Sequence, residues 1–372
     1  MKTCDVVVIG AGMAGMSVAA LLADRLKVAV VETESQPGYH ATGRSAATFI
    51  GSYGNPVVRK FTLASESDLR KPDPEFWPNP LMKDRGLIWI AMPGQEEALA
   101  NHLSSTGAGE RIPVEKACEI IPILNAATIS EATFEADPAD LDVNEILMGY
   151  VRLFRKNGGE LHCDSPVSRL ARDGGSWTIE SGQETFSAPV VVNAAGAWAD
   201  EVAALAGLKK VGLTPLRRSV AILPPPDGVD PSEWPILGEI GENFYFKPDA
   251  GRILISPADE TAVEPHDAFA DDMALAAGID AFEKATTMKV TRVEHTWGGL
   301  RTFSPDRAQV IGFDPGTEGF FWLAGQGGYG IQSAPAAARF ATGLIVDGRM
   351  PESLKPFGID PAEVAPDRYL KA

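Results

Sequence analysis

Three glycines stand close to the start of the chain, between an apolar run and a stretch rich in alanine and leucine. The run Asp5 to Ile9 reads Asp-Val-Val-Val-Ile and is typical of a parallel strand that is buried on both faces. Gly10, Gly12 and Gly15 form the motif G-x-G-x-x-G. Residues 14–26 favour a helix. A glycine turn between a strand and a helix is the context in which this motif binds a dinucleotide.

The three glycines have separate roles in such a unit. The first allows a tight turn, the second lets a pyrophosphate approach the backbone, and the third lets the helix lie close to the strand. Free N–H groups and the dipole at the helix start attract the phosphates. A second predicted strand, Lys27 to Val31, ends on Glu32, which is placed to accept a hydrogen bond from a ribose 2′-OH. FAD and NAD satisfy this pattern equally, and an ordinary glycine turn without a ligand is the alternative.

Charge and cysteine content narrow the class of protein. The chain of 372 residues has 50 acidic and 33 basic side chains, so its field repels nucleic acid and anionic membrane surfaces. Cys4, Cys118 and Cys163 are too widely spaced for a disulfide framework or a zinc site. No apolar run reaches the roughly 18 residues that a membrane span needs. We therefore expect a cytoplasmic protein that has no nucleic-acid partner and is not integral to a membrane.

Three later stretches are rich in small residues. Residues 37–47 suit a loop and a helix start laid against a large planar ligand, for which nicotinamide enzymes have no obvious need. Residues 190–192 predict a buried strand, and residues 193–196 a turn that covers the cofactor. Residues 320–324 predict another strand, whose carboxyl end opens into the glycine-rich residues 325–330. Ligands of open α/β sheets bind at such ends.

In this order, the motifs resemble the D-amino acid oxidase and glycine oxidase superfamily of flavoproteins, and within it the catabolic D-arginine dehydrogenases most. Residues 10–32, 42–47, 192–198 and 325–332 carry the resemblance, which runs over nearly the whole chain. It implies non-covalently bound FAD and a two-domain α/β fold of the glutathione-reductase-like, D-amino acid oxidase type. One domain is a Rossmann-like FAD-binding domain, and the other binds substrate on a mainly antiparallel β-sheet. In this superfamily the helix that starts near residue 331 faces the pyrimidine edge of the flavin.

We expect the two domains to be built from alternating segments of the chain. Residues 1–80, 138–212 and 305–372 form the FAD-binding domain, and residues 81–137 and 213–304 form the substrate-binding domain. Strand-like runs in the substrate-binding domain are Leu87 to Met92, Ser219 to Leu223, Asn243 to Lys247, Arg252 to Ser256 and Lys289 to His295. These runs predict a sheet that roofs the active site.

The motifs and the resemblance together assign the cofactor-binding residues. They are Gly10, Gly12, Met13, Ala14, Gly15, Glu32, Thr42, Gly43, Arg44, Ser45, Ala46, Ala47, Val167, Ala195, Gly196, Trp198, Gly325, Gly327, Gly328, Tyr329, Gly330, Ile331 and Gln332. The five histidines of the chain show no metal-binding spacing, so we expect no metal site.

Hydride transfer from a substrate Cα to the flavin needs no protein nucleophile, so the protein has to hold the substrate in place. Arg218 and Arg301, each at the edge of a predicted strand, are candidates for gripping a substrate carboxylate, and Tyr245 can donate a further hydrogen bond. By resemblance, all three match carboxylate-binding positions of the D-arginine dehydrogenases. The resemblance also makes Tyr53 an active-site tyrosine and places the Gly328 carbonyl near the substrate amine.

Two positions of the side-chain pocket depart from the D-arginine dehydrogenase pattern. Leu87 stands where those enzymes place a glutamate, and burying a guanidinium against leucine costs several kcal/mol. Thr48 stands where they have a histidine near the amine, so a bound water or earlier loss of the proton has to serve instead. We therefore expect neutral or hydrophobic D-amino acids to be preferred over D-arginine and D-lysine.

The predicted activity is FAD-dependent oxidative deamination of D-amino acids to imino acids, which hydrolyse to 2-oxo acids and ammonia. A quinone or an electron-transfer component is the expected electron acceptor. Glycine, sarcosine, proline and 2-hydroxy acids are alternative substrates, because the same clamp would hold them. A flavin-binding protein without turnover and a plain NAD-dependent dehydrogenase are alternatives from other classes. The retained pocket residues argue against the first, and residues 37–47 argue against the second.

Overall fold

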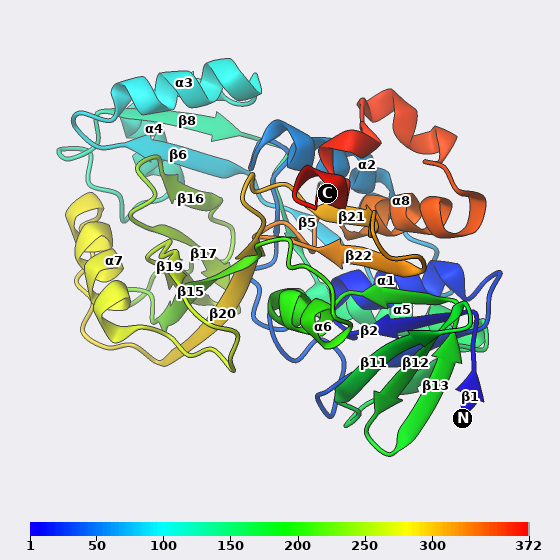
Figure 1. Cartoon of the computed structure of the whole chain (residues 1–372). Helices are drawn as coiled ribbons and strands as arrows, with labels where there is room; N and C mark the ends of the chain where they lie inside the picture. Colours follow the sequence, from blue (N-terminus) through cyan, green and yellow to red (C-terminus); the bar gives the residue numbers. More distant parts are fainter. Residues whose placement is uncertain (371–372) are drawn as a thin grey trace.

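The computed structural model describes residues 1–370, which form two parts that meet side by side (Figure 1). The first part is built on a six-stranded sheet. In sheet order its strands are β10 (Glu160–His162), β3 (Val28–Val31), β2 (Val6–Ile9), β14 (Val190–Asn193), β22 (Phe320–Ala324) and β21 (Val310–Phe313). All neighbours are parallel except β21 and β22. The valine and phenylalanine runs of the inner strands are buried on both faces, as expected of a covered parallel sheet.

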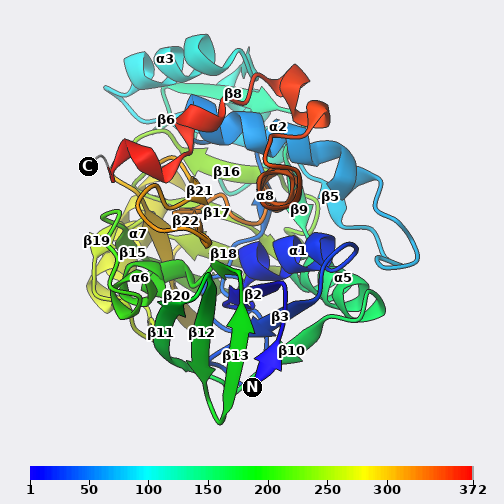
Figure 2. The same cartoon turned by 45° about the vertical axis from the view of Figure 1, so that its right-hand side comes forward.

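Both faces of this sheet are covered (Figure 2). Helices α1 (Met13–Leu22), α5 (Val143–Lys156) and α8 (Ala334–Asp347) pack together on one face. The other face carries α6 (Ala199–Leu205) and a small sheet of β1 (Lys2–Thr3), β13 (Glu184–Ala188), β12 (Ser176–Ser181) and β11 (Val167–Asp173). Val6 and Val8 pack on the helix side and Val7 on the small-sheet side, because side chains alternate along a strand.

The second part is built on a large sheet that is antiparallel except where β6 and β16 pair. Its strands are, in order, β19 (Thr261–Ala262), β15 (Thr214–Leu223), β18 (Arg252–Ser256), β17 (Tyr245–Asp249), β16 (Ile236–Glu239), β6 (Leu87–Ala91), β8 (Glu131–Glu135) and β7 (Glu110–Ile112), and β20 (His295–Phe303) also pairs with β15. Helices α4 (Val114–Ile120) and α7 (Asp272–Ala285) cover one face, and α3 (Glu96–Thr106) packs on the other, against β6. The rest of that other face, including Arg218 and Tyr245, turns toward the first part.

The remaining elements belong to neither of the two main sheets. They are the sheet of β4 (Thr48–Phe49), β9 (Ala139–Leu141) and β5 (Met82–Asp84), the helix α2 (Pro56–Arg70), and short 3-10 helices at Gly196–Trp198, Glu352–Phe357, Pro361–Glu363 and Pro366–Arg368. The fold is therefore the expected α/β combination of a Rossmann-like unit and a mainly antiparallel sheet. No helix within residues 1–370 is both long enough and apolar enough to cross a bilayer.

The strand predicted over Lys289 to His295 is wrong, since β20 begins only at His295. Residues 291–294 are all exposed, so their alternation of polar and apolar types reflects no buried face. The segment is instead held by charges, with Lys289 paired to Glu283 at 3.0 Å. The N–H of Val290 also donates to a Glu283 carboxylate oxygen at 2.7 Å.

The helix start predicted within residues 37–47 is also absent, because this stretch consists of turns. The Gly43 N–H donates to the Gly38 carbonyl at 2.8 Å, and Gly38 has a φ of +75°. Ala47 adopts a φ of +58°, which is uncommon for a residue with a Cβ. Small side chains allow this loop to fold tightly against the glycine turn.

Candidate active site

The glycine turn between β2 and α1 has the geometry that its three glycines predict. Gly10 has a φ of +101°, and a Cβ there would lie 2.6 Å from the Ala194 carbonyl oxygen. A Cβ at Gly15 would lie 1.9 Å from the Gly10 carbonyl oxygen, so only glycine lets the helix come this close. A Cβ at Gly12 would meet only Thr42 Oγ1, at 3.4 Å. The middle glycine therefore leaves open space beside the helix N-terminus, where a pyrophosphate is favoured.

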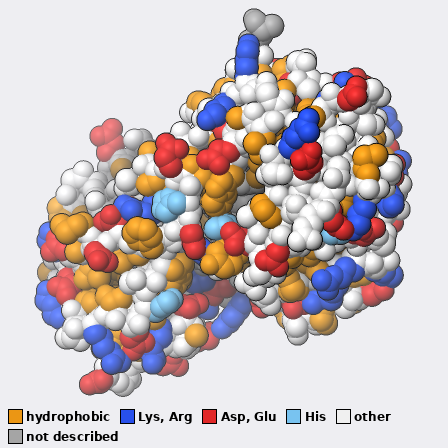
Figure 3. Space-filling view, turned by 60° about the horizontal axis from the view of Figure 1, so that its bottom comes forward, with side chains coloured by type: hydrophobic (Ala, Val, Ile, Leu, Met, Phe, Trp, Pro, Cys, Tyr) orange, Lys and Arg blue, Asp and Glu red, His pale blue; other side chains and the backbone are white. Residues whose placement is uncertain are grey.

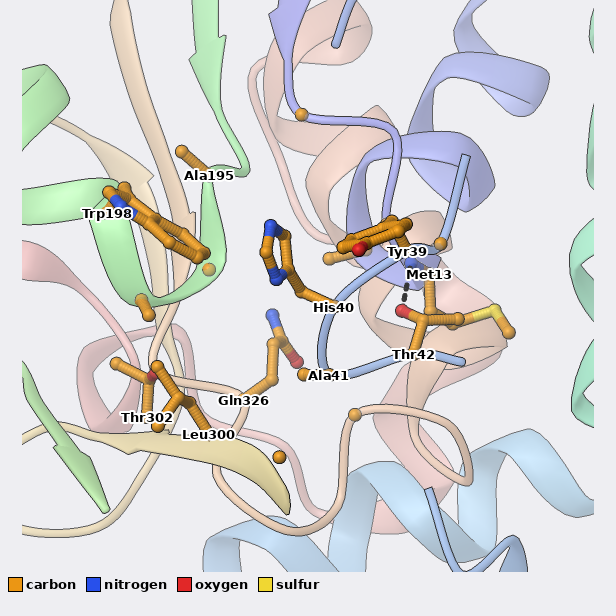
Figure 4. Close-up of a pocket in the computed structure, with 18 of the residues that line it drawn as sticks. Met13, Tyr39, His40, Ala41, Thr42, Ala195, Trp198, Leu300, Thr302 and Gln326 are labelled. Carbon is orange, nitrogen blue, oxygen red and sulfur yellow. Dashed lines mark hydrogen bonds between the residues drawn. The ribbon is translucent and has the colours of Figure 1, made fainter. Parts of the chain in front are cut away.

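Two side chains tie neighbouring loops to this turn. Thr42 Oγ1 accepts a hydrogen bond from the Met13 N–H at 2.9 Å (Figure 4). The Glu32 carboxylate accepts from the Ala11 N–H at 2.6 Å and from the Glu34 N–H at 3.0 Å. Glu32 is half-buried and lines the cavity beside the turn, and each of its oxygens keeps a lone pair that can accept from a ribose.

A cavity of about 500 Å³ runs from the glycine turn to the large sheet. At the surface, a hollow lies between the two parts of the molecule, with histidine, acidic and hydrophobic side chains around it (Figure 3). The expected cofactor-binding residues that line the cavity are Gly10, Gly12, Met13, Ala14, Glu32, Thr42, Arg44, Ser45, Ala46, Val167, Ala195, Gly196, Trp198, Gly325, Gly327, Gly328, Gly330 and Ile331. Segments far apart in the sequence thus converge on one site.

Five expected cofactor-binding residues do not line the cavity: Gly15, Gly43, Ala47, Tyr329 and Gln332. Gly15 and Gly43 permit close packing against the carbonyls of Gly10 and Gly38. The carbonyl of Ala47 accepts from the Leu141 N–H at 2.9 Å. Tyr329 packs with Val58 and Phe303. Gln332 accepts from the Ile50 N–H at 2.9 Å and donates to Thr62 Oγ1 at 3.0 Å, so these residues support the cavity wall from behind.

Other lining residues were not assigned from the sequence. His40 lies opposite Trp198, with ring centroids 4.6 Å apart, and both rings border the cavity (Figure 4). Residues 266–268 come from a loop of the second part, and Arg44 holds this loop by donating to the Ala268 carbonyl at 2.7 Å. His40 lies within the 37–47 stretch that was expected to contact a ligand, whereas no local motif marks the 266–268 loop, which reaches the site only through tertiary folding.

A smaller cavity of about 70 Å³ adjoins the first. The predicted pocket residues Thr48 and Leu87 and the predicted active-site residue Tyr53 line it, together with Ile50, Trp89, Ile236 and Phe244. Arg218, Tyr245 and Arg301 line both cavities and therefore stand at their junction. The two arginines do not lie at strand edges as predicted. Arg218 lies inside β15 and Arg301 inside β20, and these strands pair with each other.

The two arginines at the junction differ in their partners. Arg218 is 6% exposed and donates to the Asp259 carbonyl at 2.9 Å and to the Glu260 carboxylate at 3.3 Å. Within residues 1–370, no carboxylate lies at ion-pairing distance from Arg301. Burial by itself lowers the pKa of Arg301, but the hydroxyls of Tyr245, Tyr53 and Tyr329 outweigh it and raise that pKa. Arg301 is therefore a half-buried cation that lines the cavity and is surrounded by tyrosines.

Tyr245 is half-buried at the same junction, and its buried hydroxyl has no hydrogen-bond partner within the described residues. Burial raises the pKa of Tyr245, but the positive charges of Arg301 and Arg218 outweigh burial and leave that pKa below its ordinary value. Tyr329 differs, because burial and the neighbouring Tyr53 raise its pKa to about 12. The Tyr245 hydroxyl is thus a hydrogen-bond donor that faces two cations and needs an acceptor.

The described residues contain no group of histidine, cysteine, aspartate and glutamate side chains that could hold a metal ion. The site is instead defined by a phosphate-binding glycine turn, an acidic residue after the second strand, and a cavity that continues into an arginine–tyrosine junction. This fold and this site define the class of Rossmann-type dinucleotide oxidoreductases with a β-sheet roof.

The chain belongs to the FAD dependent oxidoreductase (DAO) family, whose model matches residues 5–344. FAD is therefore its cofactor, and the residues that line the larger cavity are those that would hold it. The open space beside Gly12 and the acceptor oxygens of Glu32 fit the pyrophosphate and ribose of this group.

Known relatives share this family membership. Glycine oxidase from Pseudomonas aeruginosa is 26% identical over 97% of this chain and 98% of the relative. Human mitochondrial dimethylglycine dehydrogenase is 26% identical over 99% of this chain but only 44% of that protein, so the chain spans less than half of this relative. The structures of L-proline dehydrogenase from P. horikoshii and glycine oxidase from Geobacillus kaustophilus match with TM-scores of 0.83 and 0.84. At 20% identity and at least 98% coverage of every chain, these matches show a shared fold.

Proposed function

We propose that the protein oxidises the carbon–nitrogen bond of a small D-amino acid with a neutral side chain. FAD, when bound, supplies the hydride acceptor. Loss of a hydride from Cα and of a proton from the amine converts the substrate into an imino acid, which water hydrolyses to a 2-oxo acid and ammonia. Chain residues bind and orient the substrate, and from the resemblance to D-arginine dehydrogenases we propose that the Gly328 carbonyl accepts a hydrogen bond from its amine.

The junction of the two cavities carries the proposal. There Arg301 has no carboxylate partner within residues 1–370, and the Tyr245 hydroxyl has no hydrogen-bond partner. A partly buried charge and a buried donor without partners are costly. A substrate carboxylate satisfies both at once, in the bidentate geometry that a guanidinium favours. These two groups support a small carboxylate, and an α-amino acid above all, as the ligand.

The smaller cavity supports a preference for neutral side chains. Its wall is mostly apolar, with Leu87 only 1% exposed. The one fully buried carboxylate along this cavity is Glu239, which already accepts from the Gln95 amide and from the backbone N–H of Asn243. Glu242 also lines this cavity but is exposed to water. A cationic substrate side chain would therefore lose its hydration against an apolar wall, where the carboxylates are either already hydrogen-bonded, as in Glu239, or exposed, as in Glu242.

The D configuration is supported by the resemblance of Tyr53, Arg218, Tyr245 and Arg301 to positions of D-arginine dehydrogenases. A second candidate is the oxidation of glycine or an N-substituted glycine. The small volume of the pocket favours it, as do relatives named glycine oxidase and dimethylglycine dehydrogenase.

We further propose a quinone or an electron-transfer component as the electron acceptor, and the cytoplasm as the compartment. The free state of Cys4, Cys118 and Cys163 supports a reducing compartment.

Anaerobic reduction of the bound flavin, followed at its absorption band, tests the proposal. The panel contains D-leucine, D-phenylalanine, D-arginine, L-leucine, glycine, sarcosine and L-proline. Rapid bleaching by D-leucine, with slow bleaching by D-arginine and L-leucine, is the expected result. Bleaching by glycine and sarcosine alone establishes the second candidate, and bleaching by D-arginine above all others refutes the neutral pocket. If no compound of the panel reduces the flavin, amino-acid oxidation itself is excluded.

A further inference from the structure

A buried carboxylate lies directly behind the smaller cavity. Glu135 is the last residue of β8, is 6% exposed, and pairs with Leu87 across the β6–β8 ladder. Side chains alternate along β6, so that Leu87 and Trp89 face the cavity whereas Ile88 and Ile90 face the opposite core. Glu135 stands opposite Leu87 and therefore belongs to the face that carries the cavity.

Three donors from three different elements converge on this carboxylate. Trp89 on β6 donates its indole N–H to Oε1 at 3.1 Å. His102 on α3 reaches the same oxygen through Nε2 at 3.3 Å. Ser52, in the turn that precedes α2, donates its hydroxyl to Oε2 at 2.8 Å. Ring packing adds to this network, because the Trp89 and His102 centroids lie 5.1 Å apart.

Two of the three donors control the walls of the smaller cavity. Trp89 itself lines the cavity. Ser52 directly precedes Tyr53, another lining residue, in a turn whose Gly54 has a φ of +93°. A carboxylate that is buried to this degree is tolerated only when its oxygens are hydrogen-bonded or paired. Hydrogen bonds to Glu135 therefore hold the Trp89 indole and the Ser52 turn in place. These are two walls of the smaller cavity, and a single carboxylate fixes both.

We infer that Glu135 is a positioning residue that sets the width of the pocket for the substrate side chain. The inference rests on the proposed function, since it takes the smaller cavity as the side-chain pocket. Glu135 does not touch the junction of Arg218, Tyr245 and Arg301, so it acts on the side chain of a ligand and not on its carboxylate. Replacement of Glu135 should therefore weaken ligand binding more when the side chain of the ligand is larger.

Carboxylates without an amine show the effect of Glu135 on side-chain binding alone, because they bind without being oxidised. Acetate fills only the carboxylate position, whereas 4-methylpentanoate adds the side chain of leucine. Binding of each to the holoenzyme is measured as a change in the flavin absorption spectrum. In Glu135→Gln we expect the Kd of 4-methylpentanoate to rise about tenfold, with the Kd of acetate changed less than about twofold, as misfit in an apolar pocket costs this much.

Glu145→Gln is the matched control, because Glu145 is a similarly buried carboxylate on α5 that pairs with Arg152 at 2.6 Å, far from the cavity. It should alter neither Kd. Ser52→Ala removes one donor without disturbing the carboxylate, and should raise the Kd of 4-methylpentanoate in the same direction by about threefold. This second variant keeps the test decisive if Glu135→Gln fails to fold.

Equal weakening of both ligands, or no change in either, overturns the inference. The Kd values of both carboxylates are measured without turnover. If wild-type flavin is reduced by no amino acid but the two carboxylates still respond differently to Glu135→Gln, the proposed substrate is wrong while the positioning role stands.

Discussion

Arg301 occupies the space that any side chain at position 328 would need. A Cβ at Gly328 would lie 2.9 Å from Nη1 of Arg301 and 3.1 Å from its Cζ. The glycine therefore leaves the space in which the guanidinium rests, near Tyr245, Tyr53 and Tyr329. Since Arg301 is the end of a flexible side chain, the conflict would be relieved by moving the guanidinium and not the backbone.

Gly328→Ala should therefore impair substrate binding more than folding. We expect the KM for the preferred amino acid to rise about tenfold or more, because a displaced clamp loses its alignment with the carboxylate. Thermal unfolding should change little. Gly316→Ala is the control, since a Cβ at that exposed glycine would meet only Asp314 Oδ1 at an ordinary 3.6 Å. An unchanged KM in Gly328→Ala would contradict this view of the clamp.

The two arginines of the junction should respond differently to replacement by lysine. Arg218 is already paired with Glu260, whereas Arg301 has no carboxylate partner among residues 1–370 and can bind the ligand. We expect Arg301→Lys to raise the Kd for acetate about 10- to 100-fold, and Arg218→Lys to have a smaller effect, as bidentate charged hydrogen bonds are lost. Arg252→Lys, at an exposed ion pair with Glu294, should leave the Kd unchanged. A larger effect at Arg218 would reverse the assignment.

Carboxylate binding should weaken at alkaline pH because of Tyr245. The protonated hydroxyl donates to the carboxylate, so binding is strongest below the pKa of Tyr245 and is lost as pH rises through it. The neighbouring arginines lower this pKa, so the loss should begin below about pH 10, the ordinary value of tyrosine. The Kd of acetate, determined at a series of pH values from about 7 to 11, measures this loss of binding.

Tyr245→Phe should bind acetate more weakly at neutral pH and lack this alkaline loss. Tyr150→Phe, at a buried tyrosine of α5, should keep it. Should the phenylalanine variant at 245 show the same alkaline loss as the wild type, another group is responsible.

Asp306 should contribute stability that acid removes. Burial raises the pKa of this carboxyl, but hydrogen bonds from Arg368 and Tyr369 and from the Ala308 N–H outweigh burial and lower it to about 2. The stabilisation is present above the unfolded pKa of about 4 and disappears as pH falls toward 2. Asp306→Asn should therefore reduce the free energy of unfolding at pH 7, and the difference from wild type should shrink steadily as pH falls from about 4 through about 2.

Urea unfolding at a series of pH values measures the effect of Asp306→Asn. Asp173→Asn, at an exposed position of β11, is the control. A difference that persists undiminished into acid would mean that the Asp306 pair is not its source.

The glycine turn and its helix were predictable because most of the residues that shape them are neighbours in sequence, although Gly10 also lies against the Ala194 carbonyl. The sequence from Asp5 to Glu32 contains the strands, the turn and the acidic residue of this unit. Valine runs at Val190 and phenylalanine runs at Phe320 likewise predicted strands, since a strand that is buried on both faces has to be apolar throughout. At residues 289–294 charged residues alternate with valines but form no buried face, and there the strand prediction from the apolar pattern failed.

The substrate junction depended on the tertiary structure. Arg218, Tyr245 and Arg301 were named one by one, but only the pairing of β15 with β20, and of β17 with β18 beside β15, brings them to one place. The network around Glu135 gave no sequence signal at all, since its members lie on β6, β8, α3 and a turn. Local conformation follows from neighbouring residues, whereas partners across sheets follow from strand order and register, which only the folded chain decides.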